Sequence, residues 1–97
     1  MKVTNMTSNK GNKIANQFII YNDNEEYFQS YKSIIVKKVT QWFFNYEQKE
    51  IKIYLDKNYW NYSKTTGKYR NIFLNEATKE TEKKIASGEY ILTDLNK

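Results

Sequence analysis

The chain has 97 residues, a formal net charge of +5 at pH 7, 16% aromatic residues and neither cysteine nor histidine. These absences exclude disulfides, thiol nucleophiles, zinc–thiolate sites and a Ser-His-Asp triad. The length predicts a single domain over residues 1–97. Aromatic content at this level predicts a folded core, because each buried ring removes roughly 150–250 Å² of surface from water.

The sequence also limits where the protein acts. It has no run of about 18 apolar residues that would cross a membrane as a helix. Its N-terminus lacks the apolar stretch of a signal peptide. We therefore expect a cytoplasmic protein that has no membrane partner. Because the chain has no cysteine or histidine, we also expect it to fold without metal or cofactor.

The first third of the chain predicts a polar lead-in followed by a hairpin. Residues 1–15 are polar, and we expect them to be flexible at least at their start. Two β-rich runs, 16–22 and 26–31, flank the turn-forming sequence "NDNEE". Asn and Asp favour turns, and the second run alternates with the period of a strand. The two runs are therefore predicted to pair.

The middle of the chain predicts further antiparallel strands. Residues 33–39 are β-branched and form the clearest strand, which residues 40–46 continue in extended form. The sequence "EQKE", residues 47–50, reads as a polar turn. Residues 51–55 alternate again, and the side chains predicted to point inward are Ile51, Ile53 and Leu55. Together these runs predict a meander of three or four strands.

The periodicity then changes to that of a helix. Ser63 or Thr65 can cap its N-terminus by accepting from a free backbone N–H. Tyr69 and Phe73 lie at i and i+4 and predict the apolar face. Asn75 ends or bends the helix. The residues predicted for the opposite, polar face are Lys64, Lys68, Asn71 and Asn75.

A second helix is predicted to begin at Thr78, with Gly88 as its C-terminal cap. Residues 89–95 are apolar enough to return to the core as a strand or an extended tail. The fold class is therefore α+β. We expect a three- to five-stranded antiparallel sheet, arranged as a meander, with one or two short helices packed on one face.

The strongest functional signal is a basic and aromatic segment, because residues 57–75 contain no acid. One interpretation places cationic side chains on phosphates and stacks an exposed ring on a base. The residues concerned are Lys64, Lys68, Arg70, Tyr59 and Trp60. The common alternative is an ordinary helix with buried rings and solvated lysines.

Arg70 is the doubtful member of this set. At about 100° of rotation per residue it lies roughly 160° from Lys68, so it joins the lysines only by reaching around the helix. It is the only arginine in the chain, and a lone arginine is often placed where fork-shaped hydrogen bonding is needed. It can instead tie the helix to the sheet, through Asp56 or Glu76.

Three weaker signals remain. A sheet face with rings and lysines could bind single-stranded nucleic acid, although a half-solvated face holds the same residue types. The residues on that face would be Lys37, Phe43, Tyr46, Lys52 and Tyr54.

The acidic turn contains Asp23, Glu25 and Glu26. It could hold a hard cation, but a solvated turn is far more common. No spacing marks a hydroxyl nucleophile such as Ser63 beside a lysine base. We therefore predict a protein that is not an enzyme and has no metal site.

The opening residues 1–20, the block "FQSYKSIIVKK" and the pattern W-x-Y-S-K-T-T-x-K-Y-R-N-x-F-L from Trp60 to Leu74 resemble a family of small uncharacterised proteins. Phages and mobile elements of low-GC gut bacteria carry that family. The segment "VTQWFFNYEQKE" is longer here than in the family. The resemblance implies a phage-encoded accessory protein, a group to which anti-CRISPR proteins belong.

The leading hypothesis is a phage-encoded, non-enzymatic binding protein that inhibits a host defence system such as a CRISPR-Cas nuclease. Its partner would be a host protein or ribonucleoprotein complex, with exposed aromatic side chains as hot spots. The alternative is a small nucleic-acid-binding protein that uses the basic and aromatic helix or sheet face. A free strand edge and an exposed Tyr59 or Trp60 also suggest a homodimer.

Overall fold

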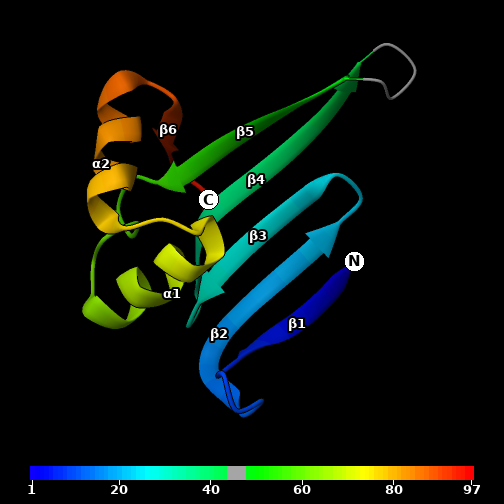
Figure 1. The fold of residues 1–97 in the computed structure, drawn as a ribbon, viewed down its shortest axis with the longest axis vertical. Coiled ribbons are helices and arrows are strands. Elements are labelled where there is room, and N and C mark those ends of the chain that lie inside the picture. Colours follow the sequence, from blue (N-terminus) through cyan, green and yellow to red (C-terminus); the bar gives the residue numbers. More distant parts are fainter. Residues whose placement is uncertain (44–47) are drawn as a thin grey trace.

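The computed structural model describes residues 1–43 and 48–97, and its six strands form one sheet in the order β1-β2-β3-β4-β5-β6. The strands are β1 (Lys2–Thr7), β2 (Lys13–Asn22), β3 (Glu25–Ser30), β4 (Ser33–Phe43), β5 (Gln48–Asp56) and β6 (Tyr90–Thr93). Between β5 and β6 lie two helices, α1 (Lys64–Leu74) and α2 (Thr78–Ser87). Both helices lie against the same face of the sheet (Figure 1). None of the described helices is long and apolar enough to cross a membrane.

The α+β class and the helices on one face are confirmed, but the sheet is larger than predicted. Strands β1 to β5 form an antiparallel meander. Strand β6 is parallel to β5, because the chain crosses back over the sheet through the two helices before it pairs. The count is therefore six strands rather than three to five.

The additional strand at the start of the sheet is β1, which belongs to the segment expected to be a polar lead-in. Its residues pair along β2, with Val3 opposite Ile20. A bulge between Asn5 and Thr7 interrupts this pairing. The Asn5 amide spans the bulge by donating to the carbonyls of Met6, Ile14 and Gln17 at 2.9, 2.7 and 3.2 Å.

The β4–β5 hairpin is longer than expected. Gln48 to Glu50, predicted as part of a turn, belong to β5, and Gln48 pairs with Phe43. The predictions for residues 44–47 lie outside the described residues. The hairpin projects beyond both helices (Figure 1). Ile51 was predicted to point inward, but 47% of it is exposed because no helix covers this end of the hairpin.

The core lies between the sheet and the helices. Its buried apolar residues are Met6, Phe28, Ile35, Val36, Leu55 and Tyr90. Phe73 of α1 stacks on Phe28 with ring centroids 5.9 Å apart, and Tyr69 also packs against the core, as predicted. Ser63 caps α1 by accepting from the Thr66 N–H at 3.1 Å. These contacts fix which side of α1 faces the sheet.

A carboxylate whose side chain is only 7% exposed joins the segment between the helices to α2 and β6. Glu76 accepts hydrogen bonds from the Thr81 hydroxyl at 2.6 Å, the Tyr90 hydroxyl at 2.7 Å and the Lys84 ammonium at 2.8 Å. Burial raises the pKa of Glu76, but the bonds from Lys84, Thr81 and Tyr90 outweigh it, so the pKa lies below its ordinary value of 4.5. Burial and the bond to Glu76 raise the pKa of Tyr90 to about 12.

This arrangement predicts an acid-sensitive contribution to stability. Because the pKa of Glu76 is lower in the folded than in the unfolded state, its carboxylate stabilises the fold above the unfolded pKa. That stabilisation is lost as pH falls through the folded pKa. Glu76→Gln should lower the free energy of unfolding at pH 7 by roughly 1–3 kcal/mol and flatten its decline between neutral and acidic pH. Urea denaturation at several pH values measures both effects.

The matched control is Glu50→Gln, which removes an exposed carboxylate from β5. It should retain the wild-type pH profile. If Glu76→Gln and the wild type lose stability in parallel as pH falls, Glu76 does not have the role assigned here.

Candidate functional site

The loop that follows β5 is shaped by Asp56, which is fully buried. Its carboxylate accepts from the N–H groups of Asn58 at 3.1 Å and Tyr59 at 2.9 Å. It also accepts from the Leu95 N–H at 2.9 Å, which holds the C-terminal segment beside the loop. These bonds to backbone N–H groups stabilise a sharp turn after β5. The aromatic residues that follow the turn lie in the loop that leads into α1.

The aromatic side chains of this loop have different environments. Tyr59 and Tyr62 are 38% and 49% exposed, and their rings meet edge to face at 5.5 Å. Trp60 is half-buried against the core, and its ring centroid lies 5.2 Å from the Arg70 guanidinium carbon. The sequence left open which ring faces a partner. Exposure favours Tyr59, with Tyr62 beside it, whereas Trp60 mainly packs within the protein.

Arg70 is fully buried and joins the loop to both helices. One terminal nitrogen of its guanidinium donates to the Trp60 carbonyl and to Asn61 Oδ1 at 3.1 Å. The other donates to Asn71 Oδ1 at 3.0 Å and Thr78 Oγ1 at 2.9 Å. Within the described residues no carboxylate forms an ion pair with it. The planar fork of an arginine suits this set of neutral acceptors, which a lysine could not match.

The prediction that Arg70 joins Lys64 and Lys68 on an outward surface is therefore wrong. Helical rotation places Arg70 on the inner side of α1, and the acceptors of the loop and α2 hold it there. Burial lowers the pKa of Arg70, while the charges of Glu76 and Glu82 raise it. Arg70 thus lies inside the fold, as the alternative interpretation has it, although its hydrogen-bond acceptors are neutral groups rather than Asp56 or Glu76.

The two lysines are exposed one turn apart on α1. We call Tyr59, Tyr62, Lys64 and Lys68 the basic-aromatic surface. Residues 57–75 provide no acidic side chain to neutralise it, and the first turn of α1 contains no acid. The positive end of the helix dipole adds to the attraction for an anion.

A hollow of about 190 Å³ adjoins this surface, between α1 and the loop that connects β1 to β2. Lys68, Tyr69 and Ile72 contribute the helix side. The remaining lining residues are Thr7, Ser8, Asn9 and Ile14. The Lys68 ammonium lies 5.3 Å from the centroid of the Tyr69 ring. A partner that contacts Lys68 can therefore also reach an apolar and polar recess beside it.

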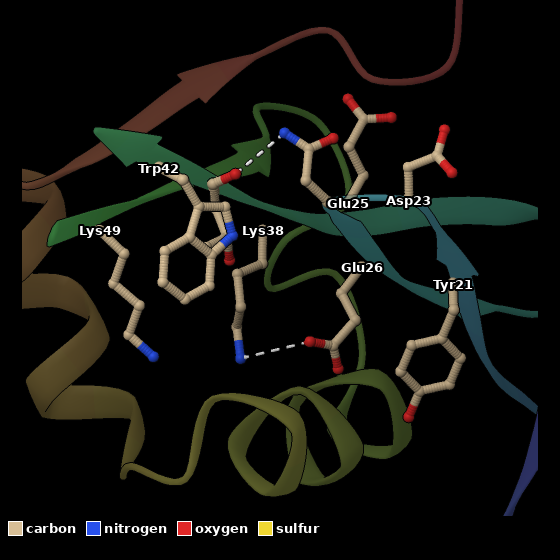
Figure 2. A pocket seen from close by; sticks show the side chains of 9 residues that line it. Tyr21, Asp23, Glu25, Glu26, Lys38, Trp42 and Lys49 are labelled. Atoms are coloured by element: carbon tan, nitrogen blue, oxygen red, sulfur yellow. Dashed lines mark hydrogen bonds and ion pairs between the residues drawn. The ribbon is translucent and has the colours of Figure 1, made fainter. Parts of the chain in front are cut away.

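A second hollow, of about 270 Å³, lies on the part of the sheet that extends past the helices. Of its lining residues, the sequence analysis named only the acidic turn, Asp23, Glu25 and Glu26. Figure 2 shows Tyr21, Glu26, Lys38, Trp42 and Lys49 pointing to one side, while Asp23 and Glu25 point away. Its cations have neighbours: Lys38 lies 3.9 Å from the Glu26 carboxylate, and Lys49 lies 5.8 Å from the Trp42 ring centroid. This hollow is therefore less suited to an anionic partner than the basic-aromatic surface.

The acidic turn does not form a metal centre in the described part of the chain. Asp23 and Glu25 diverge from Glu26 (Figure 2). No group of three or more acidic, histidine or cysteine side chains in residues 1–43 and 48–97 could hold a metal ion.

The fold and these surfaces define a small α+β protein whose first helix and the loop before it present cations and aromatic rings from a segment that contains no acid. The chain belongs to the family described as "Family of unknown function (DUF8033)", whose family model matches residues 1–89. Comparison with curated proteins and with solved structures gives no match.

The different environments of the loop rings predict different effects on stability. Trp60→Ala should lower the free energy of unfolding by about 2–4 kcal/mol, because it removes a half-buried ring from the core and from Arg70. Tyr59→Ala should lower it by less than about 1 kcal/mol, since it loses mainly an exposed edge-to-face contact. Chemical denaturation of both variants gives the comparison. A greater loss for Tyr59→Ala would reverse the assignment of the two rings.

Proposed function

We propose that this protein acts by binding a macromolecular partner through the basic-aromatic surface and has no catalytic activity of its own. The observation that carries the proposal is the joint exposure of two rings and two lysines in a segment without acid. Exposed tyrosines supply large contact area at little conformational cost and often dominate binding energy. Lysines around them attract an acidic partner and orient it during encounter.

The partner that we favour is a host protein or ribonucleoprotein complex in the host cytoplasm. Two considerations support this choice. The rings offer an apolar centre that suits a protein interface. The resemblance to proteins carried by phages and mobile elements suggests a component of host defence, such as a CRISPR-Cas nuclease. Binding would then inhibit the target by covering a surface that it needs for its own function.

Nucleic acid is the second candidate, and one observation favours it. Lys64 and Lys68 project one turn apart near the N-terminus of α1, where the helix dipole is also positive. The two candidates differ in their response to salt. Binding to phosphates weakens steeply as salt rises because counterions are released, whereas a contact centred on aromatic rings weakens much less.

The test compares two lysine pairs with the same spacing. Lys64→Ala/Lys68→Ala should leave the melting temperature unchanged, because both side chains are exposed, and should reduce partner binding about tenfold, equivalent to about 1.4 kcal/mol. The control, Lys79→Ala/Lys83→Ala, removes two exposed lysines from α2 and should bind like the wild type. Capture from host lysate, with and without nuclease treatment, measures binding at low and high salt.

The outcomes separate the alternatives. Capture that survives nuclease and moderate salt, and that is lost only in the α1 variant, supports a protein partner. Binding that disappears with nuclease and falls steeply with salt supports nucleic acid. If the α1 and α2 variants both bind like the wild type, the lysines of α1 are merely solvated and the proposal fails.

A further inference from the structure

The face of the sheet opposite the helices is open. On β3, Phe28 stacks on α1 and Ser30 shares a hydrogen bond of 2.9 Å with Thr66. Because side chains alternate along a strand, Tyr27 and Gln29 point to the other face. Neither helix covers that face (Figure 1).

One row of residues crosses this open face from edge to edge. Cross-strand pairing places its members side by side on successive strands: Val3, Ile20, Tyr27, Lys37, Tyr54 and Ile91. Five of these six side chains are aliphatic or aromatic. The same alternation adds the partly exposed Phe18, Ile34 and Val39. Val3 and Ile91, at opposite edges, are 59% and 45% exposed. The open face is therefore mainly apolar, and Lys37 on β4 is the one charged member of the row.

We propose that two copies of the chain pack together through this open face. The first argument is charge. Lys37 lies 3.3 Å from the Glu25 carboxylate, and the Tyr27 hydroxyl donates to the same carboxylate at 2.9 Å. On β5, Lys52 and Glu50 lie on the same face as Tyr54, because they alternate with it along the strand, and their charges are opposite in sign. A face that carries both signs is complementary to itself in a twofold dimer, whereas its carboxylates would repel a phosphate backbone.

The second argument is the shape of the face. A hollow of about 430 Å³ opens on it, beside the segment that follows β6. Its floor includes Lys37, Val39 and Tyr54, and Asp94 and Leu95 form part of its wall. Such a recess can receive an apolar side chain from a second copy, and each copy would supply both the recess and the inserted group. Contacts of this kind are reciprocal in a twofold interface.

The third argument is area. Six strands about 4.8 Å apart span roughly 29 Å, and five residues along each strand span roughly 17 Å, so the footprint is about 500 Å² per copy. A standard interface buries about 800 Å² per partner. The open face therefore fits a weak, reversible dimer better than an obligate one.

Sedimentation of the full chain from low to high micromolar concentration tests the proposal. The wild type should show a monomer–dimer equilibrium. Val3→Glu/Ile91→Glu adds charges at the two exposed ends of the row and should weaken the dimer at least about tenfold. The matched control is Ile72→Glu, which changes an isoleucine of α1 that is 57% exposed and should leave the dimer intact. Circular dichroism checks that each variant is folded.

A measurement on the wild type alone keeps the proposal testable if a variant fails to fold. In methyl NMR spectra, the resonances of Ile20 and Ile91 should shift with concentration, and those of Ile72 and Ile85 should not. A strict monomer at high concentration, or shifts confined to Ile72 and Ile85, would overturn the proposal. Persistence of the dimer in Val3→Glu/Ile91→Glu would also overturn it.

Two further outcomes show whether the open face binds a second copy of the chain or a nucleic acid. The open face would be a nucleic-acid site if a labelled single-stranded oligonucleotide bound the wild type and Lys64→Ala/Lys68→Ala but not Val3→Glu/Ile91→Glu. That result would overturn the dimer proposal. Conversely, loss of partner capture in the lysine variant with an intact dimer would support both proposals, since the dimer does not depend on the basic-aromatic surface.

Discussion

The buried guanidinium of Arg70 is the interaction on which the helical layer depends. It connects three segments, the loop after β5, α1 and the first residue of α2, through four neutral acceptors. Each hydrogen bond to a charged group contributes roughly 1.5–3 kcal/mol when its loss leaves the charge buried. A cation fully removed from water would otherwise be strongly unfavourable. The acceptors therefore offset the burial of charge only if all three segments hold their positions together.

This constraint determines which residues remain on the surface. With Arg70 fixed inward, α1 can rotate very little about its axis. Lys64 and Lys68 must then face solvent, and Trp60 is held against the guanidinium while Tyr59 stays exposed. Arg70 is therefore not part of the basic-aromatic surface, but its buried hydrogen bonds hold the residues of that surface in position. The lysines and tyrosines provide the surface itself.

The molecule consequently has two surfaces of different character. The basic-aromatic surface belongs to the helical side and has cations without acids. The open sheet face lies on the other side and combines an apolar row with paired charges, such as Lys37 and Glu25. Because they occupy opposite sides of the sheet, self-association through one would leave the other accessible. A dimer would then present two copies of the basic-aromatic surface, and a partner with two binding sites could gain from their proximity.

Much of the fold follows from local patterns in the sequence. β-branched and aromatic runs, together with period-2 alternation, located most of β2 to β5, and Ser63, Asn75 and Gly88 have the helix-terminal roles that their chemistry suggests. Strand β1 was missed because Val3 and Met6 are its only large apolar residues. Its stability comes instead from pairing with β2. The parallel pairing of β6 is likewise non-local, since it depends on how the helices cross the sheet.

The candidate site was harder to predict, because burial of polar groups depends on partners distant along the chain. Helical periodicity placed Lys64 and Lys68 outward, but no local rule indicates that neutral acceptors would draw Arg70 completely inside. Gln17 is another large polar side chain that is fully buried, like Arg70. Its amide nitrogen and oxygen find no hydrogen-bond partner among the described residues. Composition alone cannot distinguish such buried polar side chains from solvated ones.

The most direct test of the central claim is an NMR measurement on the wild type. Arg70 is the only arginine in the chain, so its guanidinium signals can be assigned without ambiguity. We predict separate terminal N–H resonances at neutral pH that exchange slowly with water, because four hydrogen bonds and full burial restrict rotation and solvent access. A single averaged resonance that exchanges as rapidly as that of free arginine would show that Arg70 is solvated, and would contradict the account.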